Sequence, residues 1–113
     1  MVVQDESPNK REFESMNILN LHSEDDFYLI HKMVFSDHDV LTTTRERLLR
    51  SANLMKAAVL DSINSIAVVL VVEDRESQKK LRSRIIATGD QHVLLENGLT
   101  LPVNCIKHIE FPS

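Results

Sequence analysis

Apolar residues change their spacing near residue 63, and the second half of the chain has the patterns of short β-strands. Residues 66–72 (IAVVLVV) are continuously apolar and mostly β-branched, which is typical of a strand buried on both faces. Residues 80–88 then alternate, with Leu81, Ser83 and Ile85 on one face of the expected strand and basic residues on the other. These patterns predict a central strand beside a strand with one solvent-exposed face.

The pair Asn97-Gly98 predicts a tight turn between two further short strands. Both residues tolerate the positive φ that a type I′ hairpin turn requires. Pro102 cannot donate a backbone hydrogen bond, so we expect it at a sheet edge or at a corner. A last strand is expected over residues 105–111, with neighbouring side chains alternating between its faces.

Two helices are expected ahead of these strands. Ser23 can cap the first, over residues 23–35, in which three apolar residues share a face: Phe27, Ile30 and Val34. Thr43 and Glu46 form a capping-box pattern at the start of the second, over residues 43–61. Its apolar stripe is expected to pack on the core and consists of Leu48, Ala52, Met55 and Val59. The opposite face carries Arg47, Arg50, Lys56 and Asn53.

Together these elements predict an α+β fold with one domain. Residues 1–15 are almost wholly polar and charged, so we expect a flexible arm there. Residues 16–113 are long enough to bury one core without a disulfide or a structural metal. Within this domain the N-terminal helical segment would be followed by a small five-stranded antiparallel barrel over about residues 63–111.

Composition narrows the class of protein. Hydrophobic residues make up 42% of the 113 residues, whereas aromatic residues make up only 4%, so aromatic platforms for stacking bases are scarce. Cys105 is the single cysteine, which excludes an intramolecular disulfide and is compatible with a reducing compartment. The longest apolar run is too short to cross a membrane, and no secretory pattern opens the chain. We therefore expect a cytoplasmic protein with no membrane partner.

Charge is unevenly distributed along the chain. Residues 1–40 carry nine acids and three bases, whereas residues 41–113 carry eight acids and ten bases. The densest basic segment comprises Arg75, Lys79, Lys80, Arg82 and Arg84. On a strand, Lys80, Arg82 and Arg84 would project from one face about 7 Å apart, a spacing close to that of successive phosphates. Two interpretations stay open: a nucleic-acid-binding stripe of Lys79, Lys80, Arg82 and Arg84, or a solvated strand edge.

The residue types that catalyse reactions or bind metals do not form a recognisable constellation in the sequence. Five histidines are present (His22, His31, His38, His92 and His108), but no pair has a spacing typical of metal ligands. Cys105 and His108 would point to opposite faces of a strand and cannot act as a nucleophile and its base. The chain has only two glycines, so a phosphate-binding loop is not expected. We expect no enzyme activity, no cofactor and no metal.

The order of elements resembles the Sm and Hfq family over about 45 residues. The residues that carry the resemblance are the segment Asp90-Gln91-His92-Val93-Leu94-Leu95 and the pair Ile106 and Ile109 in the last strand. The resemblance implies a helix capping a strongly bent, five-stranded SH3-like or Sm-like barrel. Ser83 stands where that family usually has glycine, and no Arg-Gly or Tyr-Lys-His element lies near the last strand. The family's RNA pocket is therefore not carried over to residues of this chain.

The layout is also similar to Rho-inhibiting antiterminator proteins, which are small acidic Sm-like barrels that bind a protein. These resemblances imply a non-enzymatic regulatory module that binds RNA or a component of the transcription machinery. The alternative is a protein-interaction or oligomeric scaffold domain without nucleic acid. A homo-oligomer is expected, because Sm-like modules cover their open sheet edges by joining them in a ring.

Overall fold

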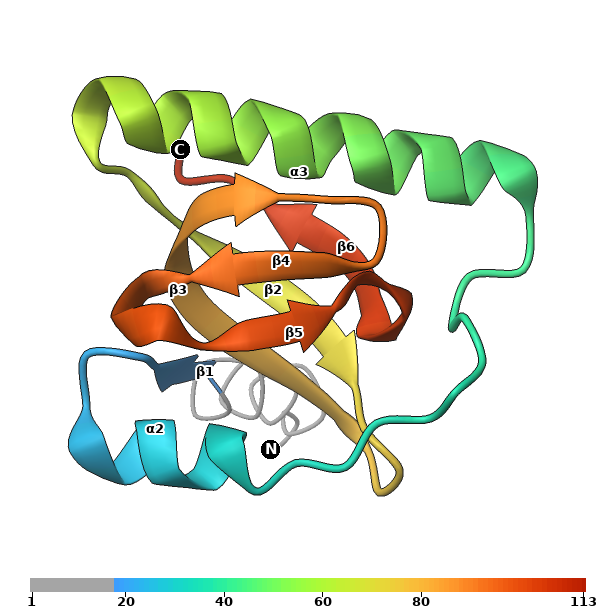
Figure 1. Cartoon of the computed structure of the whole chain (residues 1–113), viewed down its shortest axis with the longest axis horizontal. Coiled ribbons are helices and arrows are strands. Elements are labelled where there is room, and N and C mark those ends of the chain that lie inside the picture. Colours follow the sequence, from blue (N-terminus) through green and yellow to red (C-terminus); the bar gives the residue numbers. More distant parts are fainter. Residues whose placement is uncertain (1–17) are drawn as a thin grey trace, which may run out of the picture.

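The computed structural model describes residues 18–113, and the flexible arm expected over residues 1–15 lies outside them. The fold is α+β, as the sequence predicts, and residues 18–113 form two helices and a largely antiparallel sheet (Figure 1). In chain order the elements are β1 (Ile18–Asn20), α2 (Glu24–His31), α3 (Thr44–Asn64), β2 (Ala67–Glu73), β3 (Gln78–Thr88), β4 (His92–Leu95), the 3-10 turn η1 (Glu96–Gly98), β5 (Thr100–Pro102), the 3-10 turn η2 (Val103–Cys105) and β6 (Ile106–Glu110). Within residues 18–113 a short strand, β1, precedes both helices.

The strands follow one another in the order β5-β4-β3-β2-β6, and β1 pairs with β3 in parallel. The first half of β3 pairs with β2, and its second half pairs with β4 after a register shift between Ile85 and Ala87. Within residues 18–113 no pairing joins β5 to β6, so the sheet is open and does not close into a barrel. A physical reason is that β5 has only three residues and ends at Pro102, which has no N–H to donate.

Three sequence predictions about the sheet are confirmed. Residues 68–72 of β2 are all buried, as expected of a strand covered on both faces. Asn97 and Gly98 have φ values of 65° and 77°, the positive values that the hairpin turn between β4 and β5 requires. Pro102 lies on the edge strand β5, which is one of the two positions expected for it.

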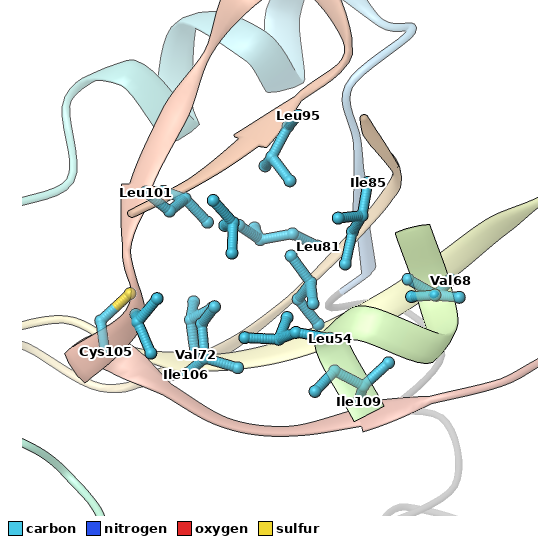
Figure 2. Close-up of a cluster of buried hydrophobic side chains, with 14 of the residues drawn as sticks. Leu54, Val68, Val72, Leu81, Ile85, Leu95, Leu101, Cys105, Ile106 and Ile109 are labelled. Atoms are coloured by element: carbon cyan, nitrogen blue, oxygen red, sulfur yellow. The ribbon is translucent and has the colours of Figure 1, made fainter. Parts of the chain in front are cut away.

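One hydrophobic core collects side chains from all five strands of the main path and from both helices. Figure 2 shows the part of this core formed by the strands and α3. In β6, Ile106 and Ile109 are both buried, although simple alternation places them on opposite faces. The pairing explains this difference, because Val72 is opposite Ile106 while Val71 is opposite His108. Lys107 is thus an extra residue in a β-bulge, and the bulge restores Ile109 to the core side.

Helix α2 is shorter than predicted. It begins after Ser23, whose hydroxyl accepts a hydrogen bond from Asp26 N–H, but it ends at His31 instead of reaching residue 35. Ile30 is buried as expected, whereas Val34 is exposed and lies outside the helix. The carbonyl of Val34 instead accepts a hydrogen bond from Arg75 N–H, which ties the chain after α2 to the turn between β2 and β3.

Helix α3 has the predicted capping box at Thr43 and Glu46 but turns the other face to the core. The buried positions are Arg50, Leu54, Ala57 and Asp61, and the predicted core stripe of Leu48, Ala52, Met55 and Val59 is exposed. The assignment of the two faces from the sequence is therefore wrong. No helix within residues 18–113 is both long and apolar enough to span a membrane.

Candidate functional site

The basic segment lies on β3 and in the turn before it. Lys80, Arg82 and Arg84 occupy the face of β3 opposite Leu81, Ser83 and Ile85, as the alternation predicts. Most of these bases form ion pairs with acidic side chains of the same chain. The ion pairs are Lys79–Asp74 at 2.5 Å, Lys80–Glu110 at 3.4 Å and Arg84–Asp61 at 2.6 Å.

These pairs affect the ionisation of their members. The hydrogen bond to Asp61 raises the pKa of the Arg84 guanidinium. Burial would raise the pKa of the Asp74 carboxyl, but hydrogen bonds from Lys79 and from two backbone N–H groups together lower it. Lys79, Lys80 and Arg84 therefore already have anionic partners. Within residues 18–113 Arg82 makes no ion pair, and its side chain is exposed.

A groove of about 560 Å³ lies between α2, β1 and the turn after β2, and Arg75 is among its lining residues. Leu19, Leu29 and Val34 supply apolar walls. Asp74 and Lys79 supply charged groups at this groove, but they pair with each other. The groove thus combines apolar surface with the Asp74–Lys79 pair, and its lining also includes the charged residues Lys32, Arg75 and Glu76.

Cys105 lies in η2 and is buried in the core. Burial raises the pKa of its thiol to about 12, and the thiol donates a hydrogen bond to the carbonyl of Pro102 at 3.1 Å. A thiol with this pKa has almost no thiolate at neutral pH, so Cys105 is a core residue. His108 contacts Glu110 at 3.4 Å instead of Cys105. Within the described part of the chain no three His, Cys, Asp or Glu residues gather into a cluster able to hold a metal ion.

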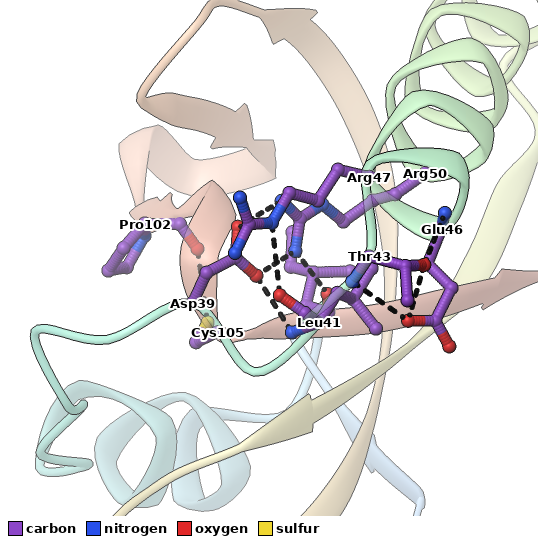
Figure 3. Close-up of polar contacts among 9 residues, drawn as sticks. Asp39, Leu41, Thr43, Glu46, Arg47, Arg50, Pro102 and Cys105 are labelled. Carbon is purple, nitrogen blue, oxygen red and sulfur yellow. Dashed lines mark hydrogen bonds and ion pairs between the residues drawn. The ribbon is translucent and has the colours of Figure 1, made fainter.

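Buried polar contacts hold the inner face of α3, which we define as Arg50, Leu54, Ala57 and Asp61, against the rest of the fold. Arg50, only 5% exposed, donates two hydrogen bonds to Asp39 at 2.7 and 2.8 Å and a third to the carbonyl of Ile106 at 2.9 Å (Figure 3). These hydrogen bonds lower the pKa of the Asp39 carboxyl, and Arg47 approaches the same carboxylate at 3.4 Å. At the other end of the helix, Asp61 is 6% exposed and pairs with Arg84. Helix α3 is thus fastened to the loop before it, to β6 and to β3.

The outer face of α3, which we define as Leu48, Leu49, Ala52, Met55, Val59 and Ile63, is a mostly apolar surface that also carries Lys56 on one flank. Leu48, Met55 and Ile63 are 66%, 61% and 67% exposed, and Leu49 and Val59 are also more than half exposed. At about 100° per residue, the outer face covers an arc of roughly 120° whose centre lies opposite the inner face. Figure 1 shows α3 along one side of the molecule, with the sheet on one side of it.

The exposure of this surface could not be predicted from the helical pattern alone. The apolar stripe is recognisable in the sequence, but its exposure depends on two ion pairs that bury the other face of the helix. Arg50 pairs with Asp39, which is 11 residues away, and Asp61 pairs with Arg84, which is 23 residues away. One sequence signal could have identified the inner face. Arg50, Leu54, Ala57 and Asp61 also recur at helical spacing, with an acid available before the helix and a base available after it.

Comparisons with known proteins provide no relative from which a function could be transferred: no family model, no curated protein and no solved structure matches this chain.

Proposed function

We propose that this chain is a non-catalytic protein-interaction module whose contact surface is the outer face of α3. The observation that carries the proposal is the exposure of five large apolar side chains on one side of a single helix: Leu48, Leu49, Met55, Val59 and Ile63. Contiguous apolar surface of this kind is typical of protein-binding sites, whereas isolated apolar residues are ordinary on any surface. An amphipathic helix also supplies anchors at the spacing that helical partners recognise.

We also propose that the fold of this chain is related to that of Sm-like proteins. The last strand, β6, returns beside β2, and β3 takes part in two strand pairings along its length. Side chains from β2 to β6 share one core, as expected of a strongly bent sheet. These features support an open, strongly bent sheet related in layout to a small barrel, which acts as a regulatory scaffold. A cytoplasmic setting fits the free, buried thiol of Cys105.

Photo-crosslinking in the source cells tests the proposed surface. A photoreactive residue replaces Ser51, at the margin of the outer face, or Gln91, an exposed control position before β4. We expect a protein adduct from position 51 that disappears when Met55→Glu is added, and no such adduct from position 91. Equal adducts from both positions, or an adduct at position 51 that survives Met55→Glu, would contradict the proposal.

Binding of single-stranded RNA is the second candidate function, and Arg82 is the observation that favours it. This side chain is exposed on β3 between Lys80 and Arg84 and has no ion pair within the described residues. Because the two flanking bases are paired with acids, we expect one main phosphate contact. Arg82→Gln should flatten the salt dependence of RNA affinity by roughly 0.7 in logarithmic slope.

Fluorescence titration at several salt concentrations measures this slope. Lys107→Gln, which removes a base from β6 instead of β3, is the control and should leave the slope unchanged. Arg84→Gln is unsuitable, because it would leave the buried Asp61 without its partner. Absence of wild-type binding at low salt would remove RNA as a candidate.

A further inference from the structure

We infer that the occupant of the outer face of α3 is the same face of a second copy of this chain, packed antiparallel across a two-fold axis. The inference rests on the proposed function, because it names the partner of the proposed interaction surface. Its support comes from the spacing of the side chains, their charges and the area available.

The outer face has the spacing of a coiled-coil seam. Leu48, Ala52, Met55 and Val59 are separated by four, three and four residues, which is the repeat that lets two helices interlock side chains. Helix α3 has 21 residues, or three such repeats, and is about 30 Å long. The face is thus long enough to form an interface with one other helix.

An antiparallel pair matches small side chains with large ones. With the two-fold axis between Ala52 and Met55, each Ala52 lies opposite Met55 of the partner copy, and each Val59 lies opposite Leu48. The methionine side chain is flexible and fills the space beside the small alanine. Ile63 and Leu49 then extend the same contact along one flank.

Charge selects the antiparallel orientation over the parallel one. A parallel pair would bring Arg45 of the two copies together, because Arg45 continues the outer face toward the N-terminus of α3. In the antiparallel pair, Arg45 lies near Ser62 and the C-terminal carbonyls of the partner helix. That end carries the negative end of the helix dipole, and α3 has no basic residue in its last turn. Lys56, the other base at this face, lies with its ammonium group 4.5 Å from the ring centroid of Phe111.

The area is sufficient for a modest, reversible dimer. An apolar side chain of this size has roughly 100 Å² to bury, so five that are half to two-thirds exposed remove roughly 600 Å² from water across two copies. This area is below the roughly 1,200 Å² at which stable specific interfaces begin, and it corresponds to a weak, transient contact. We therefore expect monomers and dimers to exchange at micromolar concentrations.

The sheet edge at β5 is a poorer route to self-association. It has three residues and includes Pro102, and short edge strands with proline resist pairing between molecules. Self-association through the outer face of α3 is therefore preferred to strand pairing at this edge.

Sedimentation equilibrium of the full chain, from low to high micromolar concentration, tests the inference. We expect a monomer–dimer equilibrium that Met55→Glu weakens by at least about tenfold, because two carboxylates would be buried near the two-fold axis. Glutamate preserves helix propensity. The control is Leu29→Glu, which places the same charge on the exposed side of α2 and should leave the dissociation constant unchanged.

Cysteine crosslinking tests the orientation. When the Leu48→Cys and Val59→Cys variants are mixed and oxidised, the disulfide between the two different variants should exceed either self-linked product. Three results would overturn the inference: a monomer at every concentration, a dimer that Met55→Glu leaves intact, or preferential linking of position 48 to itself. A photo-adduct from position 51 containing only a different protein would also overturn it while leaving the proposed interaction function in place.

Discussion

The two faces of α3 differ from those of a simple amphipathic helix, because charged side chains are buried on one face and large apolar side chains are exposed on the other. The inner face contains Arg50 and Asp61, which are 5% and 6% exposed, together with the apolar residues Leu54 and Ala57. The outer face contains large apolar side chains that are half to two-thirds exposed. The difference teaches that a charged residue of this helix can be buried when another part of the chain provides an oppositely charged partner for it.

Each buried charge of the inner face has an ionic partner supplied by another element. Arg50 has Asp39 and the carbonyl of Ile106, and Asp61 has Arg84. A charge that is paired and hydrogen-bonded can be buried at a tolerable cost, whereas an unpaired one cannot. The outer face meets no comparable partner within residues 18–113, and this is why we assign it to a second molecule.

Removing Arg50 should produce the largest loss of stability. Arg50→Met should lower the free energy of unfolding by roughly 3 to 5 kcal/mol, because it leaves Asp39 without its main partner in a largely buried position. Arg47→Met is a matched control: Arg47 contacts the same carboxylate at 3.4 Å but is 49% exposed, so the loss should be under about 1 kcal/mol. Urea denaturation measures both, and equal losses would show that the inner face is not held by the buried pair.

Replacing one leucine on each face of α3 compares how much the two faces contribute to stability. Leu54 is 2% exposed and Leu48 is 66% exposed, and both belong to α3. Leu54→Ala should cost roughly 2 to 5 kcal/mol through lost burial and cavity formation, whereas Leu48→Ala should change stability by less than about 0.5 kcal/mol. Denaturation at low protein concentration, where the monomer dominates, gives both values. A reversed order would mean that the faces are assigned wrongly.

Acid should weaken the attachment of the inner face. The hydrogen bond from Arg50 lowers the pKa of Asp39 below its ordinary 3.8. A lowered carboxyl pKa contributes stability that is present above the unfolded pKa and is lost as pH falls through the folded pKa. Asp39→Asn should therefore reduce the acid dependence of the unfolding midpoint below about pH 4. Asp37→Asn, at an exposed position in the same loop, is the control; an equal effect there would refute the assignment.

The sequence was sufficient for elements defined by local patterns. Asn97-Gly98 placed a turn correctly, the run over residues 66–72 placed a buried strand, and Thr43 with Glu46 placed the start of α3. The failures all depend on distant contacts. The extra residue Lys107 brings Ile106 and Ile109 to the same side through the pairing with β2. The early end of α2 accompanies a hydrogen bond from Arg75 to Val34.

The candidate site was only half predictable for the same reason. The apolar stripe of α3 is recognisable in the sequence, but its assignment to the core is wrong, because Asp39 and Arg84 are not neighbours of their partners in the chain. The basic stripe of β3 is also recognisable, but the acids that pair with Lys80 and Arg84 are 30 and 23 residues away. Periodicity shows which residues share a face, and only tertiary contacts decide which face is buried.

A dilution series followed by backbone amide NMR tests the central claim most directly, because it locates self-association residue by residue. On passing from high to low micromolar concentration, the account predicts shifts concentrated at the outer face of α3, around Leu48, Met55 and Val59, with the inner-face amides of Leu54 and Ala57 changing little. Shifts confined to the strand edges of β5 or β6, or no shifts at any concentration, would contradict the account.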